Sequence, residues 1–125
     1  MKAGKLSLPG GLILGLLMSG SLTAYAHSFP ERESPAAGQT LTSPPSEVTI
    51  KYDAPIEKLF AKLEVLNADG KSQAVGDPIY GSDGSTLSIK LAPLKPGGYT
   101  VKWAVVCIDT HRTQGSYTFT IGGGG

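Results

Sequence analysis

The feature that most constrains the fold of this chain is a repeated alternation of apolar and polar residues with a period of two. It occurs in five short segments, which are separated by turns rich in Gly, Pro and Asp. Successive side chains of an extended strand point to opposite faces, so each segment is expected to bury one face and expose the other. The apolar positions are Val48, Ile50 and Tyr52; Ala61, Leu63 and Val65; Leu87, Ile89 and Leu91; Tyr99, Val101, Trp103 and Val105; and Tyr117, Phe119 and Ile121.

These segments predict an all-β fold, because no stretch combines helical periodicity with capping signals. Residues 94–99 (LKPGGY) have the pattern of a tyrosine corner, in which a phenol closes the loop that enters a central strand of a Greek-key sandwich. The stretch between Ser34 and Ser46 holds three prolines and a glycine, and is expected to be an irregular crossing anchored by Leu41. We therefore predict a single-domain Greek-key β-sandwich.

The first 26 residues have the parts of a secretory signal peptide. Lysines near the start precede a short apolar core over residues 11–18 (GLILGLLM), and Ala24 and Ala26 supply the small residues of a cleavage site. The core is far shorter than the roughly 20 residues of a membrane-spanning helix. We predict cleavage after Ala26 and export. The mature chain then comprises a domain over residues 27–121 and a glycine tail over residues 122–125, which is expected to be disordered.

Charge and cysteine content exclude several classes of function. Eleven Lys and Arg residues nearly balance ten Asp and Glu residues, and no basic run occurs, which argues against a nucleic-acid partner. Cys107 is the only cysteine, so no intramolecular disulfide can form. No Ser-His-Asp set, phosphate-binding loop or pair of catalytic carboxylates is apparent. The sequence therefore predicts no catalytic site of these three kinds, and no small-molecule substrate is expected.

The two histidines, His27 and His111, give the clearest signal of function. Cleavage after Ala26 makes His27 the first mature residue, so that its α-amine and imidazole can chelate one metal ion. Asp109 and His111 lie two residues apart, and in an extended strand both would point to the same face. An amine, two imidazoles and a carboxylate form a nitrogen-rich donor set that suits Cu(II). We predict one Cu(II) ion per chain, bound by His27, Asp109 and His111.

Sulfur ligands are the alternative to this donor set. Both methionines of the chain lie in the signal peptide, so the mature protein has no thioether for a Cu(I) site. Cys107 shares its strand parity with Asp109, which leaves open a blue-copper set of this thiolate and the two histidines. The same parity aligns Cys107 with the apolar positions Trp103 and Val105. Free cysteine is among the most buried residue types, so a buried thiol is the preferred interpretation.

Several short motifs follow one another across the mature chain. They are the His27 start, residues 34–38 (SPAAG), the strand from Val48 to Tyr52, the pattern Leu94-x-Pro96-Gly97-x-Tyr99-x-Val101-x-Trp103, and Asp109-Thr110-His111 followed by Gly115-x-Tyr117-x-Phe119. Together these motifs resemble the CopC-type family of periplasmic copper-resistance proteins. The resemblance implies a small immunoglobulin-like or cupredoxin-like Greek-key barrel without enzymatic activity.

The resemblance also implies a periplasmic protein that carries or buffers copper in copper homeostasis or uptake, and we expect it to be a monomer. It implies His27, Asp109 and His111 as the Cu(II) ligands, and a CopD-type inner-membrane protein as a partner. Many relatives have a methionine-rich loop for Cu(I), which this chain lacks. Some relatives place a glutamate near the Cu(II) site at a position where Ala54 stands here, so no fourth side chain is predicted.

Two functions of other classes remain open from the sequence. Lytic polysaccharide monooxygenases also combine an N-terminal histidine with a second histidine on a β-sandwich. The short mature chain argues against such an enzyme, and so does Asp109, because a carboxylate stabilises Cu(II) over the Cu(I) state that reacts with dioxygen. The other possibility is an immunoglobulin-like interaction module without a metal.

Overall fold

The computed structural model describes residues 28–123, which form eight strands and one turn of 3-10 helix. The predicted signal peptide, His27 and the end of the glycine tail lie outside these residues. The elements are β1 (Pro30–Ser34), β2 (Thr40–Leu41), β3 (Glu47–Tyr52), η3 (Lys58–Phe60), β4 (Lys62–Leu66), β5 (Ala74–Tyr80), β6 (Thr86–Leu91), β7 (Gly97–Val106) and β8 (Arg112–Ile121). Within the described range, no helix has the length and apolarity that crossing a membrane requires.

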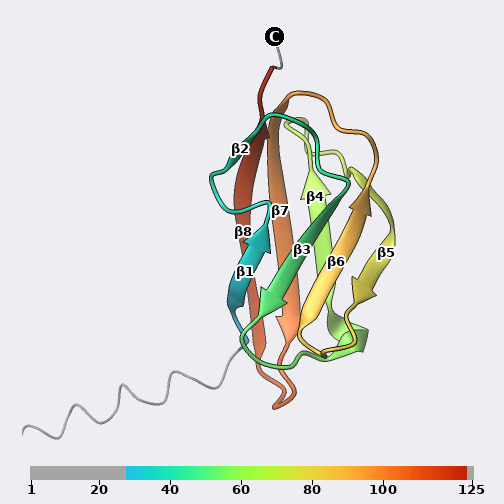
Figure 1. The fold of residues 1–125 in the computed structure, drawn as a ribbon. Coiled ribbons are helices and arrows are strands. Elements are labelled where there is room, and N and C mark those ends of the chain that lie inside the picture. The colour runs from blue at the N-terminus through green and yellow to red at the C-terminus, as the bar shows by residue number, and fades with distance from the viewer. Residues whose placement is uncertain (1–27, 124–125) are drawn as a thin grey trace, which may run out of the picture.

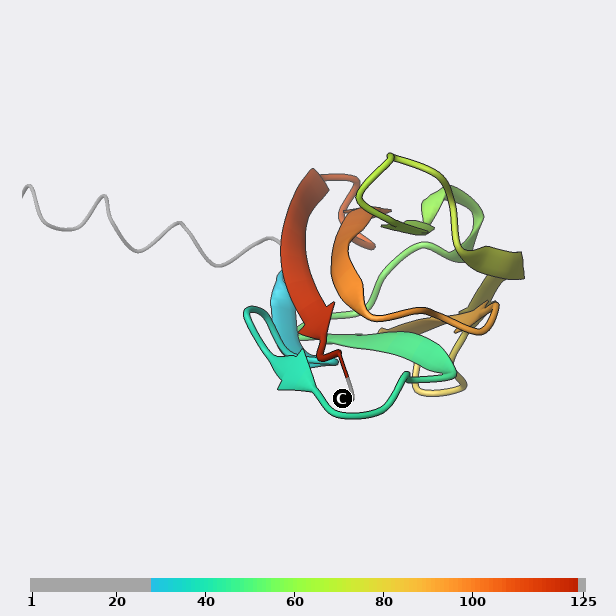
Figure 2. The ribbon, with the colours of Figure 1, turned by 90° about the horizontal axis from the view of Figure 1, so that it is seen from above.

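The strands form two sheets of four strands each, with the orders β1-β3-β6-β5 and β2-β8-β7-β4 (Figure 1). The pairings are antiparallel except for a short parallel contact between β2 and the end of β8. Seen from above, the two sheets face each other across the interior (Figure 2). The prediction of an all-β sandwich is confirmed.

The core lies between the sheets and consists mainly of the apolar positions that the alternation predicted, joined by Ile56 and Leu94. All of those positions are buried except Ala61 and Leu91, which are half-buried and pack against the core. The rings of Tyr52 and Trp103 meet edge to face, with their centroids 5.4 Å apart. Gly115 lies opposite Trp103 on β8, and a Cβ atom at this glycine would lie 2.8 Å from Cζ2 of the indole. Glycine is therefore the residue that leaves room for the tryptophan.

The tyrosine corner is present as predicted. The hydroxyl of Tyr99 donates a hydrogen bond of 2.5 Å to the backbone carbonyl of Lys95. This bond closes the loop before β7, the long central strand that leads to the opposite end of the sandwich. The start of β7 is thereby fixed relative to the core.

Three strands carry no clear signal in the sequence. β1 exposes most of its residues, and β5 is interrupted by a bulge between Val75 and Ile79. Both are edge strands, which bury few side chains and so show little alternation. The third, β2, lies in the crossing that was expected to be irregular, where Leu41 packs against the core and pairs with Ile121.

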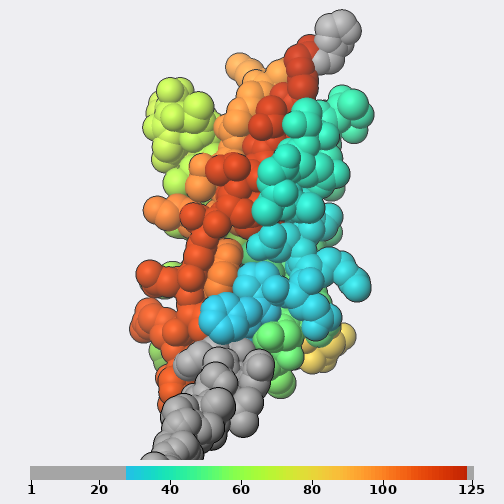
Figure 3. Space-filling view, turned by 90° about the vertical axis from the view of Figure 1, so that its left-hand side faces the viewer, coloured from blue at the N-terminus to red at the C-terminus, as the bar shows by residue number. Residues whose placement is uncertain are grey.

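β1 and β8 belong to different sheets and lie side by side on the face shown in Figure 3. The hydroxyls of Tyr52 on β3 and Tyr117 on β8 are buried and have no hydrogen-bond partner among the described residues. Burial and the nearby carboxylate of Glu33 raise the pKa of both phenols well above the ordinary tyrosine value. Burial also raises the pKa of Glu33 itself. A negative charge is therefore disfavoured at each of these three side chains.

Candidate metal centre

The loop between β7 and β8 carries Asp109 and His111. Cys107 donates its backbone N–H to the carbonyl of His111 at 2.7 Å, and Thr110 donates its N–H to the carbonyl of Cys107 at 2.8 Å. Thr110 has a φ of 75°, in the left-handed region that reverses the chain sharply. Asp109 and His111 therefore lie in a hairpin turn, and the prediction that they share one face of an extended strand is wrong.

The turn nevertheless brings the two predicted ligands together. Oδ1 of Asp109 lies 3.2 Å from Nδ1 of His111 and also accepts the backbone N–H of His111 at 3.3 Å. Imidazole nitrogen and carboxylate oxygen bind first-row divalent metals at about 2.0–2.2 Å, so ligands at adjacent corners of a square lie about 3 Å apart. The two side chains are thus spaced as neighbouring ligands of one ion. They are 47% and 56% exposed, so an ion bound by them would be accessible from solvent.

Ser28, the first described residue, is fixed against this hairpin. Its backbone N–H donates to Sγ of Cys107, and its carbonyl accepts a 2.6 Å hydrogen bond from Oγ1 of Thr113. Its own hydroxyl donates to the carbonyl of Pro55 at 3.2 Å, and no part of the residue is exposed. His27 immediately precedes Ser28 in the chain and lies outside the described residues.

The next residue, Phe29, is attached to the end of β3. Its backbone N–H donates to Oδ1 of Asp53 at 2.9 Å, and the N–H of Asp53 returns a hydrogen bond of the same length to the carbonyl of Phe29. Asp53 therefore contributes to the site by fixing the chain near its entry into the domain. The start of β1 and the β7–β8 hairpin lie at the same end of the molecule (Figure 1).

Cys107 is only 3% exposed, which confirms the prediction of a buried thiol. Its sulfur accepts the N–H of Ser28 on the inner side of the hairpin. Among residues 28–123, no three His, Cys, Asp or Glu side chains gather closely enough to hold a metal ion. Cys107 thus does not join Asp109 and His111 in such a group.

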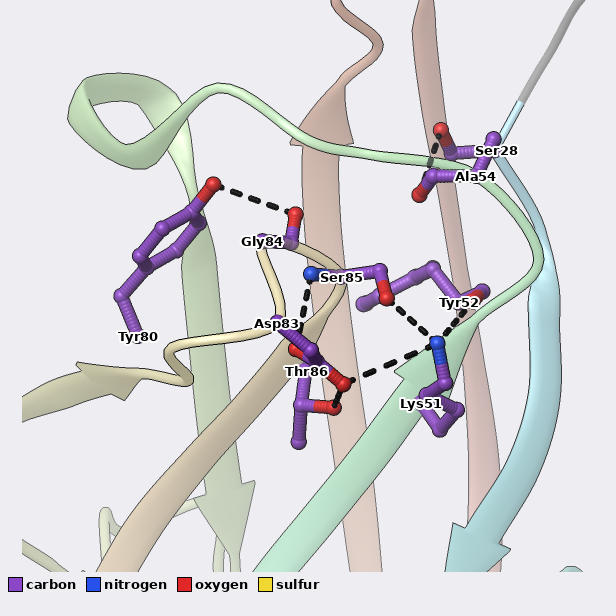
Figure 4. A network of polar contacts seen from close by, with 9 residues as sticks. All are labelled: Ser28, Lys51, Tyr52, Ala54, Tyr80, Asp83, Gly84, Ser85 and Thr86. Carbon is purple, nitrogen blue, oxygen red and sulfur yellow. Dashed lines mark hydrogen bonds and ion pairs between the residues drawn. The ribbon is translucent and has the colours of Figure 1, made fainter.

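The segment that joins β3 to η3 is hydrogen-bonded to the end of β7, where the hairpin begins. Glu57 donates its N–H to the carbonyl of Val106, and Ile56 forms a β-bridge with Cys107. A polar network holds this segment in place (Figure 4). In that network, Oη of Tyr80 donates to the carbonyl of Gly84 at 3.1 Å, and Nζ of Lys51 donates to the hydroxyl of Ser85. Oη of Tyr80 also lies 2.8 Å from the carbonyl oxygen of Ile56, in the segment that joins β3 to η3. The backbone beneath the site is therefore tied to both sheets.

Asp83 completes the polar network at the β5–β6 turn. It accepts hydrogen bonds from the N–H of Ser85 and the hydroxyl of Thr86, at 3.0 and 2.8 Å, and forms a 3.7 Å ion pair with Lys51. These hydrogen bonds, followed by the charge of Lys51, lower the pKa of the Asp83 carboxyl. Asp83 therefore has a structural role in the turn.

Sequence reasoning missed Ser28 and Thr113, the residues that attach the start of the domain to the hairpin. Their hydrogen bond joins positions separated by 85 residues, so no local pattern connects them. One signal was available for Thr113. It occupies the same parity as Tyr117, Phe119 and Ile121, and a polar residue on a buried face must find a hydrogen-bond partner.

Comparison with known proteins identifies the family. Residues 31–122 match the CopC domain, a range that spans nearly all of the described sandwich. The chain is 31% identical over 125 residues to copper resistance protein C of Escherichia coli, covering 94% of this chain and 95% of that protein. It is also 31% identical over 101 residues to protein YobA of E. coli K12, covering 79% and 82% of the two chains.

Solved structures agree with this assignment. The crystal structure of CopC from Methylosinus trichosporium OB3b superposes with a TM-score of 0.71 at 28% identity, covering 77% of this chain and 94% of that one. The fold is shared as well with PcoC, a methionine-rich copper resistance protein from E. coli, with a TM-score of 0.68 at 24% identity and coverage of 77% and 99%. The chain therefore belongs to the CopC family of copper-binding proteins, which are not enzymes.

Proposed function

We propose that this protein is exported, is cleaved after Ala26, and holds one Cu(II) ion per chain in the periplasm. The proposed ligands are the α-amine and imidazole of His27 together with Asp109 and His111. The observation that carries the proposal is the position of Ser28, which is hydrogen-bonded to residues on both sides of the loop that contains Asp109 and His111. The described part of the chain therefore begins at a residue that is attached to this loop.

The chemistry of the donors supports Cu(II) over other ions. The set contains nitrogen and carboxylate oxygen and no soft ligand, and divalent affinities at such sites peak at copper. The processed chain, residues 27–125, contains no methionine, so a thioether site for Cu(I) is not available in it. The negative charge of Asp109 further favours the doubly charged ion.

The exposure of Asp109 and His111 suits a protein that passes its ion on. A half-exposed site can exchange copper by direct contact with a second protein. We propose that the protein acts as a monomeric copper carrier or buffer, with a CopD-type inner-membrane protein as a partner. One related protein, copper transport protein CutJ of Bacillus subtilis, matches over 102 residues at 28% identity, and this region makes up 19% of its length.

A copper titration of the processed protein tests this proposal. We expect one Cu(II) per chain to bind tightly enough to compete with a chelator of known affinity. The variant His111→Ala should lose at least about tenfold in affinity, because an exposed imidazole ligand is removed while the fold is retained. A stoichiometry other than one, or a His111→Ala variant with unchanged affinity, would contradict the proposed site.

A further inference from the structure

Ser28 lies at the start of the domain, yet all of its backbone and side-chain polar groups form hydrogen bonds. Its N–H, its carbonyl and its hydroxyl are all engaged, and it is completely buried. Two of the partners, Cys107 and Thr113, belong to the β7–β8 hairpin. We call these three residues the Ser28 latch. Chain ends are usually poorly ordered unless they are tied down, so the latch fixes a segment that would otherwise move.

We propose that Thr113 and Cys107 are positioning residues of the copper site. They hold Ser28, and through Ser28 they keep the amine and imidazole of His27 beside Asp109 and His111. This inference rests on the proposed function, because it concerns how the N-terminal ligands reach the other two. Neither Thr113 nor Cys107 binds the ion in this scheme.

The two latch partners flank the predicted ligands. Cys107 lies two residues before Asp109, and Thr113 lies two residues after His111. The latch thus attaches the N-terminal segment to both ends of the ligand loop. Consecutive Cα atoms are about 3.8 Å apart, so one peptide unit joins the fixed Ser28 to His27. A chelating residue restrained in this way loses less conformational freedom when the metal binds.

The Thr113 hydrogen bond is expected to be the more important of the two. Thr113 is 7% exposed, and its hydroxyl donates to the carbonyl of Ser28 at 2.6 Å in the interior. The thiol of Cys107 is a weaker acceptor than an oxygen atom. Loss of the Thr113 hydroxyl would leave a buried carbonyl without its donor, which favours release of the Ser28 segment from the hairpin.

The test compares Thr113→Val with Thr113→Ser in the processed protein. Valine keeps the shape of threonine and removes the hydroxyl, whereas serine keeps the hydroxyl. We expect Thr113→Val to bind Cu(II) about 10- to 100-fold more weakly, the usual effect of removing a group that orients a ligand. Thr113→Ser should restore most of the affinity. Hydrogen exchange of the Ser28 amide, measured without copper, should be fast in the valine variant and slow in the other two proteins.

The outcomes separate the latch from the copper site itself. If the wild type binds Cu(II) through its amine and a folded Thr113→Val variant binds Cu(II) equally well, the proposed role of the latch is wrong. The proposed Cu(II) ligands are then unaffected. If the wild type binds no Cu(II) at its amine, the proposed function fails, whereas the hydrogen exchange of Ser28 still reports on the latch.

A second pair of variants applies if Thr113→Val does not fold. Cys107→Ser keeps a hydrogen-bond acceptor for the Ser28 N–H, and Cys107→Ala removes it. The alanine variant is then expected to bind Cu(II) more weakly than the serine variant. Equal affinities in this pair, with an unchanged exchange rate at Ser28, would overturn the proposal.

Discussion

Oδ1 of Asp109 lies 3.2 Å from Nδ1 of His111 in a loop where both side chains are about half exposed. The contact depends on the left-handed conformation of Thr110, which turns the chain between them. The carboxylate thus orients the imidazole, and the two atoms have nearly the spacing of adjacent metal ligands. The hairpin therefore holds two of the proposed donors close together.

Replacement of Asp109 by asparagine tests the role of this carboxylate. Asparagine has nearly the same shape but no negative charge, so it is a poorer ligand for Cu(II) and a poorer partner for the imidazole. We expect Asp109→Asn to weaken Cu(II) binding at least about tenfold in a chelator competition assay. Asp69→Asn is a matched control, because Asp69 lines the same surface hollow as Gly97, which begins β7 at the other end of the sandwich. Equal affinities of the two variants would argue against Asp109.

The half-buried carboxylate of Glu33 predicts a pH dependence of stability. Burial raises the pKa of Glu33 above its ordinary value of 4.5, so the folded protein binds a proton more readily than the unfolded chain. The free energy of unfolding should therefore fall as the pH rises through the window that begins near this ordinary value. Glu33→Gln removes the charge and should be more stable than the wild type at pH 7.

Chemical denaturation at pH 7 and at pH 4 checks this prediction. The advantage of Glu33→Gln should shrink at the lower pH, where the wild-type carboxyl is protonated. Glu31→Gln, at an exposed position of the same strand, controls for the loss of one negative charge. A Glu33→Gln variant that is less stable than the wild type at pH 7 would show that the carboxylate is favourably placed.

The contact between Gly115 and Trp103 predicts a large effect of a single methyl group. A Cβ atom at Gly115 would lie 2.8 Å from Cζ2 of the indole, so Gly115→Ala must displace the ring or the strand. We expect a loss of about 1–3 kcal/mol in the free energy of unfolding, typical of an overpacked core. Gly98→Ala on the paired strand is the control, because nothing lies within 4 Å of a Cβ at that position. A Gly115→Ala variant as stable as the control would show that the indole moves freely.

The fold was predictable where strands bury one face. Ile50 and Ile89 alternate with polar neighbours because the opposite face of each strand is solvated. β1 and β5 were not predictable, since an edge strand buries few side chains and β5 is also broken by a bulge. The tyrosine corner was recognisable because a short local motif, ending in Tyr99, determines its hydrogen bond.

The candidate site was predictable only in its residue types. Asp109 and His111 stood out from the sequence, but an extended strand was assumed between them and the left-handed Thr110 was not foreseen. The branched side chain of threonine disfavours a positive φ, so the residue type at position 110 does not predict a left-handed turn. The attachment of Ser28 to Thr113 was equally invisible, because it depends on how two distant segments pack.

The most direct test of the central claim is electron paramagnetic resonance of the processed protein with one equivalent of Cu(II). One sample begins at His27, and the other carries a single extra glycine before His27, which moves the α-amine away while leaving every side chain in place. We expect nitrogen hyperfine structure in the first spectrum, and a changed spectrum with weaker binding in the second. Identical spectra and affinities for the two proteins would contradict an N-terminal amine ligand.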